Sequence, residues 1–152
     1  MLARRAYELD SSFTYAATVL GDALRLNGRP RDALDAYASR GPPQTAYDMV
    51  GPALARMALG DTDDVRRRLR EITALSARQN VPGDAIAMVH AALGERDEAF
   101  AWLDSAYVSH SAALVSLATD PNWAPIRRDR RFAALVQRVQ TRTPTTGEAS
   151  AR

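Results

Sequence analysis

Apolar residues recur along the chain at helical spacing, and clusters of Gly, Pro, Asn and Ser separate the apolar stretches. Near the carboxyl end, Phe132, Leu135 and Val139 are three and four residues apart, which places them on one face of a helix. Asn27-Gly28 ends an earlier helix, because glycine readily adopts the left-handed conformation that follows a helix. The predicted helices cover residues 13–26, 30–39, 45–59, 62–78, 85–93, 96–108 and 112–118, followed by a terminal helix.

A Gly51-Pro52 pair lies inside the third of these helices. Proline has no amide hydrogen, and its ring crowds the carbonyl four residues earlier. We therefore expect the helix to be kinked or divided at this point.

Three glycines recur at nearly constant spacing, since Gly28, Gly60 and Gly94 are 32 and 34 residues apart. Each is followed five residues later by a small or β-branched residue, namely Ala33, Val65 and Ala99. A period near 34 residues is that of the tetratricopeptide repeat, in which two antiparallel helices bury their apolar faces against neighbouring copies. The spacing therefore predicts stacked helical hairpins.

The first repeat follows this pattern most closely. Its matching positions are Leu20-Gly21, Leu24, Gly28, Ala33 and Tyr37. The third repeat matches through Gly94, Ala99 and Leu103, with Ile86-Ala87 in place of Leu-Gly. The second is degenerate, because Pro52-Ala53 and Arg56 occupy positions that are usually Leu-Gly and bulky apolar.

Two segments resemble a known group of proteins. They are residues 90–107 (HAALGERDEAFAWLDSAY) and residues 120–132 (DPNWAPIRRDRRF). Both are similar to the tetratricopeptide module at the carboxyl end of bacterial regulators, including winged-helix activators, serine/threonine kinases and adenylate cyclases. Arg130 departs from the Asp-Pro-x-Phe pattern of that group. The resemblance implies a regulatory or scaffold domain.

The expected fold is all-α, a right-handed α-solenoid of about three such repeats with a degenerate carboxyl-terminal capping unit. Leu2, Ala6 and Leu9 match the buried stripe of half a repeat whose partner helix is missing. We therefore expect a fragment of a longer protein, or a domain that self-associates through an end face. Residues 1–140 form the predicted domain, and residues 141–152 are polar and are predicted to be disordered.

Composition narrows the classes of function. The absence of cysteine excludes disulfides, thiol catalysis and Cys-ligated zinc. No apolar run is long enough to span a membrane, and the amino end lacks the apolar core of a signal peptide, so we expect a cytoplasmic location. The formal charge is only +2 although all basic residues are arginine, so net charge does not indicate nucleic-acid binding.

The first helix of each repeat should line a concave face that binds a peptide or a partner helix. The candidate contact residues are Tyr15, Thr18, Asp22, Arg25, Tyr47, Val50, Leu54, Met57, Asp84, Met88 and Ala91. The alternative for Leu54, Met57 and Met88 is that they fill the core, since methionine and leucine at helical spacing commonly do so.

Arginine clusters at residues 66–70 and 127–131 offer a competing hypothesis, in which the protein contacts the phosphates of a nucleic acid. Acidic neighbours such as Asp61, Asp64 and Asp129 instead favour local ion pairs. Arg127 and Arg131 are expected to hold the segment before the last helix.

Catalytic or cofactor-binding patterns are not found in the sequence. His90 and His110 have no metal-ligand spacing, and His90 is expected to be packed or half-buried. Trp123 should wedge the segment before the last helix, and Trp102 should be partly exposed, although either could anchor a partner. We therefore expect a non-enzymatic module with a protein or peptide partner and no cofactor or metal, and keep a nucleic-acid-associated module and an unrecognised helical enzyme as alternatives.

Overall fold

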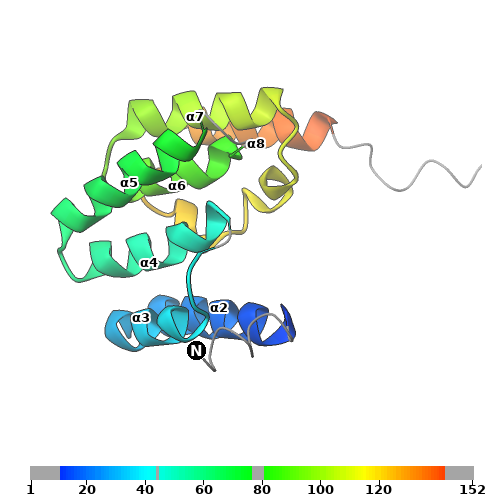
Figure 1. Ribbon diagram of the computed structural model, residues 1–152. Coiled ribbons are helices and arrows are strands. Elements are labelled where there is room, and N and C mark those ends of the chain that lie inside the picture. Colours follow the sequence, from blue (N-terminus) through cyan, green and yellow to red (C-terminus); the bar gives the residue numbers. More distant parts are fainter. Residues whose placement is uncertain (1–10, 44, 77–80, 143–152) are drawn as a thin grey trace, which may run out of the picture.

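A computed structural model describes residues 11–43, 45–76 and 81–142 of the chain (Figure 1). The helices are α2 (Ser11–Leu26), α3 (Pro30–Ser39), α4 (Tyr47–Ala58), α5 (Thr62–Ser76), α6 (Gly83–Ala92), α7 (Arg96–Val108) and α8 (Arg130–Arg142), with two short 3-10 helices, η1 (Ala112–Ser116) and η2 (Pro121–Trp123), between the last two. These ranges contain helices and no strand, so the prediction of an all-α fold is confirmed.

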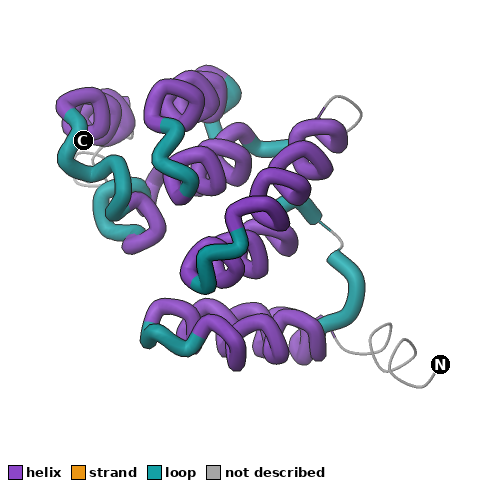
Figure 2. Tube along the Cα trace, turned by 90° about the vertical axis from the view of Figure 1, so that its left-hand side faces the viewer, coloured by secondary structure: helices purple, strands orange, loops and turns teal. Residues whose placement is uncertain are grey.

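The helices pack in consecutive pairs. Helix α2 packs on α3, α4 on α5 and α6 on α7, and the second helix of the first two pairs contacts the first helix of the next pair. Helix α4 also contacts both α2 and α6, so the first helices lie side by side. Figures 1 and 2 show this succession, with α2 and α3 at one end and α7 with α8 at the other.

The turns within the three pairs share one geometry. Gly28, Gly60 and Gly94 have φ values of 73°, 80° and 77°. In each turn the glycine N–H donates to the carbonyl three residues earlier, and the next N–H donates to the carbonyl five residues earlier. This is the Schellman arrangement that terminates helices. The glycine spacing in the sequence therefore reflects a repeated turn.

The small residues that follow these glycines are all in the core. Ala33, Val65 and Ala99 are fully buried. One helical turn later, Tyr37, Leu69 and Leu103 are buried as well. These six positions were predicted to pack in the core, and their burial confirms that they do.

Tyr37 of α3 lies where α2 and α4 approach each other closely. A Cβ atom added at Gly51 would lie 2.7 Å from the Tyr37 hydroxyl oxygen, and one added at Gly21 would overlap the ring. Both contacts are closer than real Cβ atoms show. The absence of side chains at these two glycines is therefore what admits the tyrosine between the helices.

The predicted interruption at Gly51-Pro52 does not divide the helix, since α4 continues through Pro52 to Ala58. Pro52 cannot donate to the carbonyl of Asp48, and Arg40 Nη2 donates to that carbonyl instead at 2.7 Å. The Arg40 guanidinium also pairs with the Asp48 carboxylate at 2.8 Å and is only 3% exposed. The helix continues because a buried arginine replaces the missing backbone donor.

Some predicted boundaries are wrong by a few residues. Thr141 and Arg142 end α8, so the predicted disordered tail does not begin at residue 141. The helix predicted over residues 112–118 is the shorter 3-10 helix η1. The half repeat predicted at Leu2, Ala6 and Leu9, and residues 143–152, lie outside the described residues.

The segment from η1 to α8 closes one end of the molecule. Trp123 is 2% exposed and belongs to a core cluster with Leu103, Ile126 and Phe132. The prediction that Trp123 wedges this segment is confirmed. Because η2 contacts α6, the same segment borders the face formed by the first helices.

Candidate functional site

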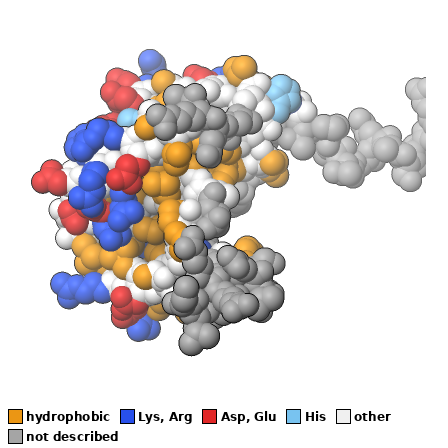
Figure 3. Space-filling model, in the orientation of Figure 1, with side chains coloured by type: hydrophobic (Ala, Val, Ile, Leu, Met, Phe, Trp, Pro, Cys, Tyr) orange, Lys and Arg blue, Asp and Glu red, His pale blue; other side chains and the backbone are white. Residues whose placement is uncertain are grey.

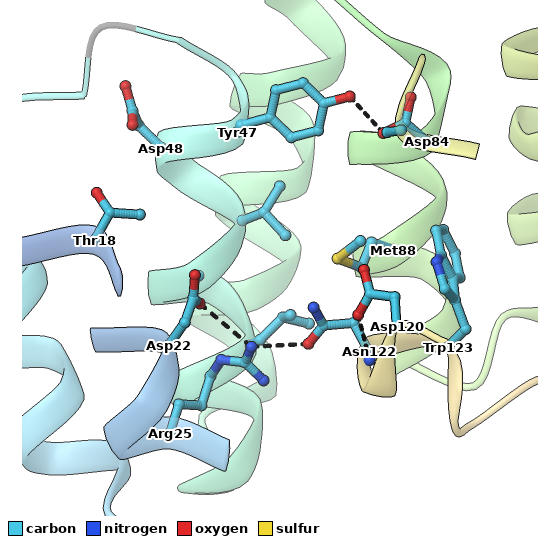
Figure 4. Close-up of a pocket in the computed structure, with 14 residues that line it drawn as sticks. Thr18, Asp22, Arg25, Tyr47, Asp48, Asp84, Met88, Asp120, Asn122 and Trp123 are labelled. Atoms are coloured by element: carbon cyan, nitrogen blue, oxygen red, sulfur yellow. Dashed lines mark hydrogen bonds and ion pairs between the residues drawn. The ribbon is translucent and has the colours of Figure 1, made fainter. Parts of the chain in front are cut away.

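A pocket of about 230 Å³ lies where α2, α4 and α6 face the segment that contains η1 and η2 (Figure 4). We call it the central pocket. Its lining residues are Thr18, Asp22, Arg25, Tyr47, Asp48, Val50, Gly51, Leu54, Asp84, Met88, Ala113, Asp120, Asn122 and Trp123.

Most of the predicted contact residues meet in this pocket. Those that line it are Thr18, Asp22, Arg25, Tyr47, Val50, Leu54, Asp84 and Met88. Tyr15 and Met57 are not among the lining residues. Ala91 is fully buried in the core, so its assignment as a contact residue is wrong.

The apolar residues of the pocket also belong to the core. Leu54 is 8% exposed and packs with the α4–α6 core cluster, and the partly buried Met88 packs against two clusters. Leu54 is therefore a core residue that also lines the pocket. The same packing fixes these side chains in place, so the pocket has a rigid apolar wall.

Arg25 connects the two sides of the pocket. Its Nη2 donates to Asn122 Oδ1 at 2.8 Å and to Asp22 Oδ1 at 3.3 Å, as the dashed lines in Figure 4 show. Its side chain is only 10% exposed. An arginine near the start of the chain thus holds η2, 97 positions later.

Asp84 is the most buried polar residue in the pocket, with 1% exposure. Its two oxygens accept hydrogen bonds from the Tyr47 hydroxyl at 2.5 Å and the Ser111 hydroxyl at 2.6 Å. Burial and the Asp84 carboxylate raise the pKa of Tyr47 well above its usual value, so the phenol stays protonated and remains a donor. A buried carboxylate with hydrogen-bonding partners of this kind is a structural acceptor.

Asp22 has a similar arrangement on α2. Its Oδ1 accepts a hydrogen bond from the Tyr37 hydroxyl at 2.7 Å. Burial is the main cause that raises the pKa of Tyr37 above its usual range, and the Asp22 carboxylate adds to it. The two tyrosine–aspartate bonds fix α2 to α3 and α4 to α6.

Sequence patterns did not identify Asp48, Ala113, Asp120 and Asn122 as pocket residues. Asp48 directly follows the predicted contact residue Tyr47, so helical spacing gave it no separate signal. The other three lie in the η1–η2 segment, whose return to α6 depends on tertiary contacts. The motif at residues 120–132 and its Trp123 drew attention to this segment, but as structure and not as part of a pocket.

Three arginines of the first cluster, all on α5, form ion pairs. Arg67 and Arg68 both pair with the buried carboxylate of Asp64, and Arg66 pairs with Glu95 at 2.5 Å. Figure 3 shows basic and acidic side chains interspersed on the face that it presents. These ion pairs favour the hypothesis of local pairing over the hypothesis that the cluster contacts phosphates.

The second arginine cluster holds the segment before α8. Arg127 donates to the backbone carbonyls of Ala118 and Asp120. Arg131 pairs with Asp97 at 2.7 Å and with Asp129 at 2.8 Å. The prediction that these two arginines tie down this segment is confirmed.

The two histidines contact different neighbours, Glu95 for His90 and the Val108 carbonyl for His110. His90 is half-buried, as predicted, and its Nδ1 lies 2.8 Å from Glu95 Oε2. Burial acts to raise the pKa of Glu95, but hydrogen bonds from His90 and Arg66 outweigh it and lower that pKa below its usual value. His110 lies in the turn that follows α7 and has a φ of 60°.

Helix α2 exposes several large apolar side chains. They are Tyr15, Val19, Leu20 and Leu26. The uncovered apolar surface that was expected at the amino end concerns the half repeat of residues 1–10 and not this helix. Residues 1–10, which precede this helix, lie outside the description.

Across the described ranges, no three His, Asp or Glu side chains are grouped as metal ligands would be. None of the helices in the same ranges has the length and apolar character required to cross a bilayer. Comparisons of the chain with protein-family models, with curated proteins and with solved structures give no match.

Proposed function

We propose that this protein is a non-catalytic interaction domain, a tetratricopeptide-like α-solenoid that binds a peptide or a partner helix in the central pocket. The observation that carries the proposal is the pocket itself. It combines a rigid apolar wall at Val50, Leu54 and Met88 with a polar rim, and the three first helices and the η1–η2 segment all contribute to it. Recognition of peptides commonly uses such a combination.

The repeat assignment has independent support. The same Schellman turn follows the first helix of each pair, and the equivalent small residues Ala33, Val65 and Ala99 are equally buried. In a stack of this kind the first helices form one continuous face. A partner bound there would contact several repeats at once, as expected for a scaffold or regulatory domain of a larger bacterial protein in the cytoplasm.

The ion pairs of the arginine clusters argue against the nucleic-acid alternative. Each arginine at positions 66, 67 and 68 is already paired with a carboxylate. Binding phosphate would require those pairs to be broken. Self-association through an end face stays a separate prediction, tested by the mass of the domain in solution.

The test is a peptide-display selection on the purified domain, followed by affinity measurements with the recovered peptides. Ala113 is exposed in η1 and lines the pocket, so Ala113→Trp should fill the pocket without disturbing the core. Ala101→Trp is the matched control, since Ala101 is exposed on α7 away from the pocket.

We expect the Ala113→Trp variant to lose at least about tenfold in affinity, which corresponds to about 1.4 kcal/mol, while the control binds like the wild type. Unchanged melting temperatures would show that both variants are folded. Failure to recover any binding peptide, or equal binding by the Ala113→Trp variant, would overturn the proposal.

A further inference from the structure

Carboxylates predominate among the charged residues of the central pocket. Asp22 of α2, Asp48 of α4, Asp84 of α6 and Asp120 beside η2 all line it. Arg25 contributes the one guanidinium among the lining residues. The pocket is therefore acidic, although the whole chain carries a formal charge of +2.

The arginines near the pocket are already committed to partners. Arg25 is held by Asp22 and Asn122, and Arg40 is held by Asp48. These pairs leave the charges of Asp84 and Asp120 in excess. Asp84 is buried, where the effective dielectric constant is low and its field extends further than in water.

Asp120 is the acidic group at the rim. It is half-buried, and its Oδ1 accepts a hydrogen bond from the Asn122 N–H at 2.9 Å, which caps η2. Arg127 donates to the backbone carbonyl of Asp120 at 2.7 Å. That bond engages the main chain and not the carboxylate, and Asp120 is one of the residues that line the pocket.

The arginines of the first cluster lie outside the acidic pocket. Arg66, Arg67 and Arg68 are carried by α5, which contributes no residue to the pocket. A cationic ligand would be attracted to the acidic pocket. An acidic ligand would experience the opposite field.

We propose that the central pocket selects a cationic peptide segment, in which an arginine or lysine stands next to a large apolar side chain. This inference rests on the proposed function and names its ligand class. The apolar side chain packs against Leu54 and Met88, while the cation lies at the rim near Asp120. Charge-assisted hydrogen bonds to a carboxylate are among the stronger polar contacts a ligand can make.

The test uses three synthetic peptides that share one length and the same leucines and differ at two positions, which are both Arg, both Gln or both Glu. Binding to the full chain is followed by fluorescence anisotropy at low and at moderate salt. Asp120→Asn removes the charge and keeps an oxygen that can cap η2. Asp104→Asn is the control, because Asp104 is an exposed carboxylate on α7 that pairs with Arg138 outside the pocket.

The expected affinity order is Arg above Gln above Glu, with the Arg peptide about threefold to tenfold tighter than the Gln peptide at low salt and less so when salt is added. Asp120→Asn should remove most of the difference in affinity between the Arg and Gln peptides, and Asp104→Asn should leave that difference intact. Equal binding of the three peptides, or a margin that Asp120→Asn does not reduce, would overturn the selectivity. If that binding is still blocked by Ala113→Trp, the interaction function survives; if no peptide binds, both proposals fail.

Discussion

Arg40 Nη2 donates to the backbone carbonyl of Asp48, the acceptor that Pro52 leaves without its helical partner. The same guanidinium donates to the Asp48 carboxylate and to the Thr18 hydroxyl. One buried side chain therefore maintains α4 through a proline and connects it to α2. The position of the pocket wall on α4 depends on this contact.

Replacement of Arg40 by methionine should destabilise the fold by about 3 kcal/mol, because the Asp48 carboxylate and carbonyl both lose the guanidinium that donates to them. Pro52→Ala supplies a backbone N–H for that carbonyl. The cost of Arg40→Met should therefore be about 1 kcal/mol smaller in the Pro52→Ala background. Urea unfolding of the four proteins measures this coupling. Equal costs in both backgrounds would show that the arginine does not compensate for the proline.

Gly51→Ala should cost about 1–3 kcal/mol, because the added methyl group would meet the Tyr37 side chain. The nearest atoms are the hydroxyl oxygen and the carbon that bears it, both at 2.7 Å. Tyr37→Phe removes that oxygen, so the cost of Gly51→Ala should fall in the Tyr37→Phe background. Thermal unfolding of the single and double variants provides the test. A fully additive result would exclude the hydroxyl oxygen as a source of the cost.

His110 occupies the turn position that glycine fills at the other three Schellman turns. Its φ is 60°, and the N–H of Ser111 donates to the carbonyl of Ala106 in the same pattern. His110→Gly should be more stable than His110→Ala by about 1 kcal/mol, since both remove the imidazole and only alanine keeps a Cβ in the left-handed region. The two melting temperatures give this difference directly, and equal values would refute it.

Arg131 donates hydrogen bonds to the Asp129 carboxylate from its guanidinium and from its backbone N–H. These bonds lower the pKa of Asp129 to about 2. A carboxyl group whose pKa is lower in the folded state stabilises the fold above its unfolded pKa, and that contribution is lost as the pH falls through the folded value. The Asp129 carboxyl should therefore titrate near pH 2 by NMR. In an Arg131→Gln variant its midpoint should move up towards the usual value, near 4. A midpoint near 4 in the wild type would contradict the assigned pair.

The repeat pattern was sufficient to predict the helical pairs and their turns. Gly28, Gly60 and Gly94 each determine a local geometry, and the residue five positions later must be small or narrow for the helices to pack. Such features depend on short-range sequence. The α7 range and most of the pocket residues followed from the same pattern.

Long-range contacts could not be predicted in this way. The continuity of α4 depends on Arg40, which lies twelve residues before Pro52. The expectation that proline interrupts a helix considers only residues of that helix, so it could not include this arginine. The contribution of Asp120 and Asn122 to the pocket depends on the path of the η1–η2 segment and on the bond between Arg25 and Asn122. Because position 110 is histidine and not glycine, the glycine pattern did not predict the fourth Schellman turn.

The most direct test of the interaction function is an NMR titration of the isotopically labelled domain with the Arg peptide. The account predicts shift changes concentrated at Thr18, Val50, Met88 and Asn122, and their loss in the Ala113→Trp variant. Shift changes confined to Arg66 and its neighbours on α5, or none at peptide concentrations that saturate the anisotropy signal, would contradict binding in the central pocket.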